Sequence, residues 1–235
     1  MCQTPPAHRP DPPPRGLRRV AEDMNPIERA TIIHYHRHRI REHGVGSPRA
    51  LGWRAPASQH GRFEAISRAA DFAHASVLDV GCGTGDLSAF LARRHAGLHY
   101  LGIDQVVEFI DCARERHGAR PRTAFAVADF THAALPQADF VVACGTLNYR
   151  SADPAFVFDS IDRLYAASRR ALIFNLLDAA VFPEHPLLVG RDIAEVEAHC
   201  RTLSDDLGTV RDYADDDVTL VLRRRPDLPG ASAGR

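Results

Sequence analysis

The chain has 235 residues, of which 45% are apolar, so it is long enough for one sizeable α/β domain with a hydrophobic core. Its formal net charge of −1 argues against a protein that acts mainly on nucleic acid or on an anionic membrane surface. No apolar run approaches the roughly 20 residues of a membrane-spanning helix. The five scattered cysteines include no CxxC pair, so they indicate neither a zinc site nor a disulfide framework. We therefore expect a cytoplasmic protein with no membrane partner.

The two ends of the chain differ in composition from the rest. Residues 1–23 are rich in proline and arginine and lack the apolar core of a secretory signal, so they predict a disordered tail. Met24 precedes a helical pattern, which leaves open whether residues 1–23 are a true part of the protein. Residues 226–235 predict a second disordered tail. Between the tails we expect an N-terminal helical cap over 24–75 and an α/β domain over 76–225.

The cap begins with a well-marked helix. Asn25 is suited to cap it, Pro26 to begin it and Gly44 to end it, so a helix is predicted over 26–43. Residues 45–60 contain two glycines and two prolines and predict a loop, which an amphipathic helix over 62–72 follows.

Strands and helices alternate from residue 76 onward. The predicted strands span 76–80, 98–103, 123–128, 139–144, 171–176, 210–213 and 218–222. The predicted helices span 86–95, 106–117, 154–168 and 191–201. Such alternation favours a Rossmann-like, doubly wound, mostly parallel sheet with helices on both faces. The polar residues 214–217 join the last two strands as a hairpin, so one strand is antiparallel.

A glycine loop follows the first of these strands. Residues 77–86 read VLDVGCGTGD, in which an apolar strand leads directly into Gly81, Gly83 and Gly85 and then into a helix. Glycines at these positions allow a tight turn and let a ligand approach the backbone. A dinucleotide fingerprint requires glycine or alanine at position 86, and the carboxylate of Asp86 repels a pyrophosphate there. S-adenosylmethionine has no phosphate and carries a sulfonium cation, so it is compatible with Asp86. The alternative for Asp86 is a helix-start residue placed for the helix dipole.

Acidic residues also follow the next two strands. Asp104 stands 19 residues after Gly85, and its two carboxylate oxygens suit two adjacent ribose hydroxyls. Asp129 suits the amino group of an adenine, and Phe130 suits its ring. All three strand ends meet at the carboxyl edge of the predicted sheet, where open α/β sheets bind ligands.

From about residue 76 to 222 the chain resembles the class I S-adenosylmethionine-dependent methyltransferases, on the motifs VLDVGCGTG, GID and ADF. The resemblance implies seven strands with the last antiparallel, and S-adenosylmethionine as the cofactor. It implies that Asp79 and the three glycines contact the methionine part of the cofactor and that Arg62 pairs with the cofactor carboxylate. It implies that Asp104 and Gln105 hold the ribose and that Asp129 and Phe130 hold the adenine. Cys144 would lie along the edge of the cofactor. The chain has GTLNYR after its fourth strand and lacks the Asn/Asp-Pro-Pro-Tyr/Phe motif of enzymes that methylate base amino groups. The alternative for Arg62 is a solvated helix charge, which needs no function.

Three residues are candidates for catalysis: His36, Tyr149 and His185. Methyl transfer from a sulfonium needs an aligned acceptor, and a general base is optional. His36 shares the apolar stripe of the first helix, so it is either a pocket residue or a packing histidine. Tyr149 follows the fourth strand and His185 lies in a proline-rich loop after the fifth. His34 and His38 are spaced for a metal but lack a third ligand, so no metal is predicted.

The predicted function is transfer of a methyl group from S-adenosylmethionine to a small-molecule acceptor. The alternatives are a methyltransferase acting on a protein or nucleic acid, a NAD-binding Rossmann oxidoreductase, which Asp86 opposes, and a binding protein that has lost catalysis. The balanced charge argues against a nucleic-acid partner. The acceptor atom, the pathway and the oligomeric state are not determined by these patterns.

Overall fold

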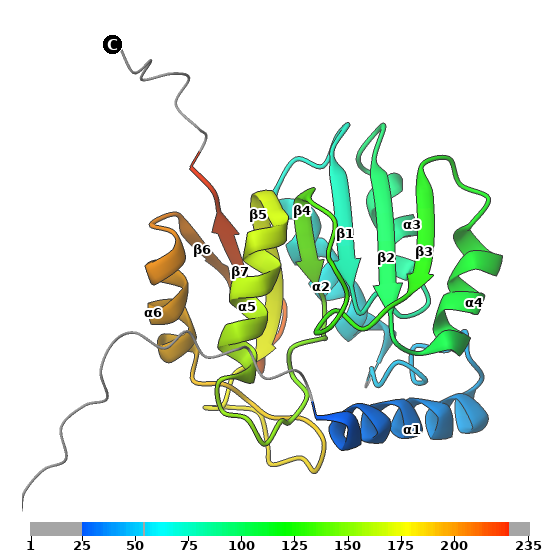
Figure 1. Cartoon of the computed structure of the whole chain (residues 1–235), viewed down its shortest axis with the longest axis horizontal. Coiled ribbons are helices and arrows are strands. Elements are labelled where there is room, and N and C mark those ends of the chain that lie inside the picture. The colour runs from blue at the N-terminus through cyan, green and yellow to red at the C-terminus, as the bar shows by residue number, and fades with distance from the viewer. Residues whose placement is uncertain (1–24, 54, 226–235) are drawn as a thin grey trace, which may run out of the picture.

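The computed structural model describes residues 25–53 and 55–225, and both predicted tails lie outside this part of the chain. Its centre is one sheet of seven strands in the order β3-β2-β1-β4-β5-β7-β6 (Figure 1). The strands are β1 Ser76–Val80, β2 His99–Asp104, β3 Thr123–Val127, β4 Ala138–Ala143, β5 Ser168–Leu177, β6 Leu207–Val210 and β7 Asp217–Arg223.

The first five strands are parallel, and β7 runs antiparallel to β5 with Leu177 opposite Asp217. Central strands are apolar on both faces: all but the first residue of β1 are buried, as are the last seven residues of β5. A parallel sheet needs such strands because helices cover both of its faces. The predicted fold, a Rossmann-like sheet with an antiparallel last strand, is confirmed.

Five helices cover the two faces of the sheet. On one face lie α2 Pro56–Ala69, α3 Asp86–Ala92 and α4 Val107–His117, which bury Phe63, Leu87 and Ile110 in one hydrophobic cluster. On the other face α5 Phe156–Ala167 and α6 Ile193–Leu203 bury Ile161 and Val196 in a second cluster. Figure 1 shows α5 and α6 in front of the sheet and α2 and α3 behind it.

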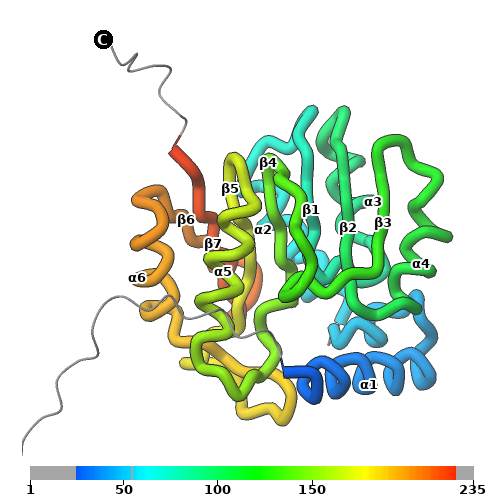
Figure 2. The backbone as a smooth tube through the Cα atoms, in the orientation of Figure 1, coloured from blue at the N-terminus to red at the C-terminus, as the bar shows by residue number. Residues whose placement is uncertain are grey.

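The remaining helix, α1 Pro26–His43, lies across the carboxyl ends of the strands (Figure 1). Its start is capped as predicted, because the Asn25 side chain accepts a hydrogen bond of 2.9 Å from the Ile27 amide. The chain after Gly44 turns back toward the strand ends (Figure 2). The Arg39 guanidinium donates to the carbonyl of Arg49 at 2.6 Å and so fastens this return segment to α1.

Several predicted boundaries differ from the structure, and the largest differences lie in the second helix and in β6. The second helix begins at Pro56 and not at residue 62, because a proline fits the first turn of a helix as well as a loop. Strand β6 ends at Val210, and residues 211–216 form the turn into β7. Tyr213, which the β-propensity pattern placed in the strand, instead donates its hydroxyl to Asp217 from this turn.

Candidate functional site

A cavity of about 280 Å³ lies between the carboxyl ends of the strands and helices α1 and α2. Its lining is mainly apolar, with polar groups supplied by the strand ends and by both helices. Most of the residues predicted for the site line it together, namely His36, Arg62, Asp79, Gly81, Gly83, Asp104, Gln105, Asp129, Phe130, Cys144 and Tyr149. Gly85 and His185 are not among the described residues that line it.

The glycine loop leaves no room for side chains. Gly81 has a φ of +71°, and a Cβ atom there would lie 2.2 Å from the Thr146 hydroxyl oxygen. A Cβ at Gly83 would lie 2.5 Å from a methyl carbon of Leu51. At Gly85 it would lie 2.7 Å from the Phe125 ring, so this third glycine packs the loop against β3. The first two glycines therefore keep the loop close to the cavity, and the third serves helix–strand packing.

Asp104 is held at the end of β2 by two backbone amides. One carboxylate oxygen accepts from the Gly83 amide at 3.0 Å, and the other accepts from the Val106 amide at 2.8 Å. Each oxygen keeps a further lone pair, so both can accept from neighbouring hydroxyls. Burial raises the pKa of Asp104 to about 6, against the lowering effect of the backbone donors. At neutral pH the group is mostly ionised and suited to a diol.

Asp79 places a second carboxyl group beside the loop. One of its oxygens accepts from the Tyr100 hydroxyl, while Oδ1 is buried and has no hydrogen-bond partner in the described structure. Burial raises the pKa of Asp79 to about 7, and the charge of Asp104 adds to this effect. A buried carboxylate oxygen without a donor is costly, so this position fits a cationic ligand group.

The Asp129 carboxylate lies at the end of β3 and is tied to its own loop and to α1. Its Oδ1 accepts from the Thr131 amide at 2.9 Å and from the Thr131 hydroxyl at 2.8 Å. The Arg29 Nε lies 3.4 Å from Oδ2. Asp129 and Phe130 thus lie under the N-terminal half of α1, which closes this end of the cavity.

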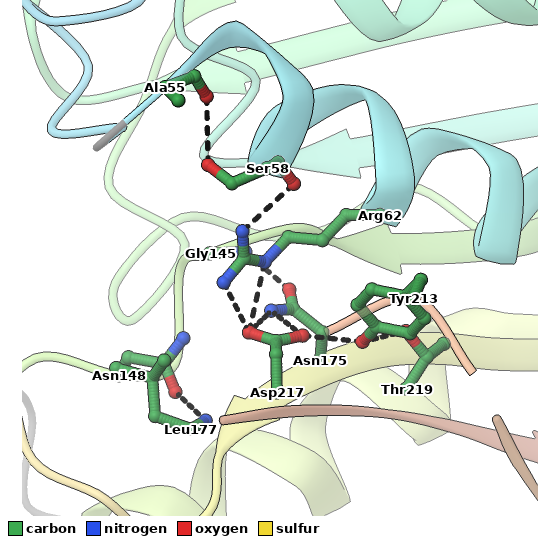
Figure 3. A network of polar contacts seen from close by, with 10 residues as sticks. All are labelled: Ala55, Ser58, Arg62, Gly145, Asn148, Asn175, Leu177, Tyr213, Asp217 and Thr219. Atoms are coloured by element: carbon green, nitrogen blue, oxygen red, sulfur yellow. Dashed lines mark hydrogen bonds and ion pairs between the residues drawn. The ribbon is translucent and has the colours of Figure 1, made fainter. Parts of the chain in front are cut away.

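Arg62 is buried, so the alternative of a solvated helix charge is wrong. Its Nε and Nη2 donate to Asp217 Oδ2 at 2.9 and 2.5 Å, and Nη1 donates to the Ser58 carbonyl at 3.0 Å (Figure 3). The guanidinium carbon lies 4.8 Å from the centre of the Trp53 ring. Three of its five N–H groups are used in these bonds, which leaves two for a ligand in the cavity.

His36 and Tyr149 meet inside the cavity. His36 Nδ1 lies 3.0 Å from the Ala50 carbonyl, which only accepts, so this nitrogen carries the hydrogen. His36 Nε2 therefore has a lone pair, and it accepts from the Tyr149 hydroxyl at 2.6 Å. Burial lowers the pKa of His36 to about 4, with a smaller lowering effect of Arg39, and burial raises the pKa of Tyr149. The pair is neutral at physiological pH, and it is both buried and part of the cavity wall.

The other predicted residues have plainer surroundings. Burial raises the pKa of the Cys144 thiol, so this group at the end of β4 stays protonated. His185 Nδ1 accepts from the backbone amides of Leu187 and Leu188 at 3.2 and 3.0 Å, and so organises the loop after β5. Asp86 pairs with Arg116 at 2.7 Å at the start of α3. The described part of the chain contains no group of three or more His, Cys, Asp or Glu side chains placed to hold a metal ion.

The structure adds two residues that the sequence patterns did not identify, Asn175 and Asp217. Both are buried polar residues next to the cavity, on β5 and β7, whereas the sequence patterns predict an ordinary strand position for Asn175 and a hairpin turn for Asp217. Trp53 lines the cavity, and its indole Nε1 is buried without a partner in the described structure.

A family model described as a methyltransferase domain matches residues 78–168. A Mycobacterium tuberculosis protein described as a candidate methyltransferase is 33% identical over 160 residues, which cover 63% of this chain and 93% of that relative. The magnesium-protoporphyrin O-methyltransferase of Rhodobacter capsulatus is 32% identical over 115 residues, which cover 48% of this chain and 49% of that protein.

Solved structures share the fold. Magnesium protoporphyrin IX methyltransferase from Synechocystis PCC 6803 with bound S-adenosylhomocysteine has a TM-score of 0.62 at 16% identity, covering 84% of this chain and all of that chain (100%). The mitomycin 7-O-methyltransferase has a TM-score of 0.62 at 20% identity, covering 83% of this chain and 60% of that chain.

The sheet order and the glycine loop define the class I methyltransferase fold. The chain belongs to the S-adenosylmethionine-dependent methyltransferase family, and its cofactor is S-adenosylmethionine. The oxidoreductase alternative is not favoured by these matches. No helix among the described residues is long and apolar enough to cross a membrane. A cytoplasmic location stays a prediction.

Proposed function

We propose that this enzyme methylates a hydroxyl group of an uncharged small molecule, with the His36–Tyr149 pair receiving the proton. The observation that carries this proposal is the pair itself, a neutral base and a neutral acid joined in the cavity wall at 2.6 Å. Relatives named as O-methyltransferases of magnesium-protoporphyrin and in ubiquinone biosynthesis support oxygen as the acceptor atom.

The cofactor contacts are proposed from the geometry of the strand ends. Asp104 accepts from the ribose hydroxyls, with Gln105 beside it, and Asp129 with Phe130 holds the adenine.

The methionine part of the cofactor is held by Asp79 and by the glycine loop. Gly81 and Gly83 allow the backbone to approach it closely, and Gly85 acts through packing of the loop. The two remaining N–H groups of Arg62 suit the carboxylate, and Cys144 forms part of the wall. The unpartnered Oδ1 of Asp79 supports this orientation, because a cationic group beside it would supply the missing contact and favour the ionised form of a carboxyl group whose pKa burial raises to about 7.

The charges in the cavity wall favour an uncharged acceptor. The carboxylates that line it are Asp79, Asp86, Asp104, Asp129 and Asp216. Among the described lining residues Arg62 is the one guanidinium, and it is paired with Asp217. Asp86 pairs with Arg116 and Asp129 with Arg29, so the net negative charge comes mainly from Asp104 and from the ionised form of Asp79. An anionic acceptor would meet this charge in a partly desolvated site, where charges interact more strongly than in water.

When bound, S-adenosylmethionine supplies a methyl group made electrophilic by its sulfonium. The residues of this chain hold the acceptor and receive its proton. As the acceptor oxygen gains a methyl group its proton becomes strongly acidic, so a base as weak as His36 suffices to take it. Tyr149 Oη accepts that proton while its own proton passes to His36 Nε2. Helix α1 covers this step and excludes water from it.

Methyl transfer into separated metabolite pools tests the proposal. A metabolite extract is divided by anion exchange before the reaction, and each pool is incubated with enzyme and methyl-labelled S-adenosylmethionine. We expect label in the unretained pool, in a product that survives mild alkali, as an ether does and a methyl ester does not. Labelling confined to the anionic pool, or release of labelled methanol by alkali, contradicts the proposal. Label in protein or nucleic acid, when the macromolecular fraction of the same cells is incubated in parallel, would favour the macromolecular alternative.

A further inference from the structure

A network of buried polar groups lies directly behind the cavity wall (Figure 3). Its centre is Asp217 at the start of β7, which is 1% exposed. This carboxylate accepts from Arg62 of α2, from the Tyr213 hydroxyl and from the side-chain amide of Asn175. A buried ion pair does not by itself indicate added stability, because desolvation offsets much of the attraction between its charges. We therefore consider what these contacts of Asp217 do besides stabilising the fold.

Asn175 connects this carboxylate to the end of β4. Its Nδ2 donates to both oxygens of Asp217 at 2.9 and 2.8 Å, and its Oδ1 accepts from the Gly145 amide at 2.6 Å. The orientation of the side-chain amide is fixed, since a backbone N–H only donates and a carboxylate only accepts. An aspartate or a leucine at 175 lacks one or both of these bonds. Asparagine is thus required by its two neighbours.

The segment that this amide holds forms the wall of the cavity. Gly145 has a φ of +77°, and a Cβ there would lie 2.9 Å from the Trp53 ring. Thr146 donates its hydroxyl to the Val80 carbonyl at 2.7 Å and lies against Gly81 of the glycine loop. The Asn148 side chain accepts from the Leu177 amide at 2.9 Å, and Tyr149 follows directly.

We infer that Asn175 and Asp217 are positioning residues of the cofactor site. They act through the Gly145 amide and set where residues 145–149 lie relative to the glycine loop. Arg62 anchors Asp217 from α2, so the helix, β7, β5 and the end of β4 are joined in one chain of hydrogen bonds. This inference rests on the proposed placement of the cofactor at the glycine loop.

Binding of S-adenosylhomocysteine by calorimetry tests it without knowledge of the acceptor. Asn175→Ala removes the link to Gly145 while the Arg62–Asp217 ion pair stays intact, so this variant is expected to fold. Asn175→Asp keeps an acceptor for the Gly145 amide but sets two buried carboxylates against each other. We expect the dissociation constant to rise about tenfold or more in both variants.

The matched control is Asp139→Ala, at the amino end of the same sheet. Asp139 accepts from the Ser76 amide and hydroxyl at 2.7 and 2.8 Å, so its loss weakens β1–β4 packing far from the cavity. Each protein is measured well below its own melting temperature. A lowered melting temperature with unchanged affinity in Asn175→Ala overturns the inference. Failure of the unmodified protein to bind S-adenosylhomocysteine contradicts the proposed cofactor site instead.

Discussion

The Tyr149 hydroxyl donates to His36 Nε2 at 2.6 Å, across a sequence separation of 113 residues. This bond joins α1 to the segment after β4, and the Ala50 carbonyl on the other side of the imidazole fixes its tautomer. The predicted boundary at residue 75 therefore separates two parts of the chain that build one cavity. His36 is buried, yet it faces a polar partner within the wall of the site.

Tyr149→Phe removes the hydroxyl of this pair and keeps the ring. We expect turnover to fall by about tenfold or more, because general acid–base groups contribute on the order of 10²–10⁴ to rates. The affinity for S-adenosylhomocysteine should change little. The unfolding free energy should fall by about 1 kcal/mol, the net worth of a typical hydrogen bond. Steady-state kinetics with the identified acceptor and chemical denaturation measure the two effects separately.

Tyr165→Phe is the control for Tyr149→Phe. Tyr165 lies at the end of α5 and its ring packs under the Arg224 guanidinium at 4.2 Å, among residues that line no part of the described cavity. Its turnover should match that of the unmodified enzyme. If Tyr149→Phe loses stability but keeps its turnover, the pair is a packing element and has no part in the proton transfer.

Acid should weaken the fold through His36. Its pKa is lowered from 6.5 to about 4 by burial, so the unfolded chain binds a proton between these values that the folded chain does not. The stability contributed by the neutral ring is complete above the unfolded pKa and is lost as the pH falls from about 6.5 toward 4. At pH 5 the loss relative to pH 8 is about 2 kcal/mol.

The pKa values of Asp79 and Asp104 are raised, so these two groups stabilise the fold as the pH falls, opposite to His36. They titrate in both the unmodified protein and His36→Gln, so their effect cancels when the unfolding free energies of the two proteins are compared. The difference in unfolding free energy between the two proteins should shrink by about 2 kcal/mol from pH 8 to pH 5. A difference that is constant with pH would mean that His36 titrates normally. His38→Gln serves as the control, since His38 is exposed beside Glu42.

Cofactor binding should depend on pH through Asp104. Its carboxylate accepts from ribose hydroxyls when ionised, and its pKa is about 6. This group alone should weaken binding of S-adenosylhomocysteine by about tenfold between pH 8 and pH 5. Asp104→Asn should raise the dissociation constant by about tenfold at pH 8 and flatten that part of the pH profile. Calorimetry over this pH range checks both, with the exposed Asp111→Asn as the control.

The fold was predictable because its signals are local and repeated. The apolar strand before Gly81 and the capped helix after Asn25 are each determined by signals within one continuous stretch of sequence. The cofactor side of the cavity followed from the same patterns, since parallel strands bring their carboxyl ends to one edge.

Residues far apart in the chain account for what the patterns missed. Arg62 has the spacing of an exposed helix charge, and only its partner 155 residues later, Asp217, explains its burial. Asn175 has no local signal, because one of its partners, Asp217, lies on β7 and the other, Gly145, lies in the segment after β4. His185 was a candidate for catalysis in the loop after β5, and its Nδ1 accepts from the backbone amides of that loop. Such side chains depend on tertiary contacts that periodicity does not encode.

Gly81→Ala tests the close approach of the glycine loop to the end of β4. The new Cβ would lie 2.2 Å from the Thr146 hydroxyl oxygen, and the φ of +71° disfavours any L side chain by about 1–2 kcal/mol. We expect a lower melting temperature and at least tenfold weaker binding of S-adenosylhomocysteine, as Thr146 and the loop move apart. Gly46→Ala, where nothing lies within 4 Å of the new atom, should alter stability by about 0.5 kcal/mol or less. Adding Thr146→Ala to Gly81→Ala removes the two closest contacts and leaves the backbone strain and the Thr146 Cβ at 3.1 Å, so affinity should recover in part. Full affinity in Gly81→Ala alone would show that the loop does not need this spacing to hold the cofactor.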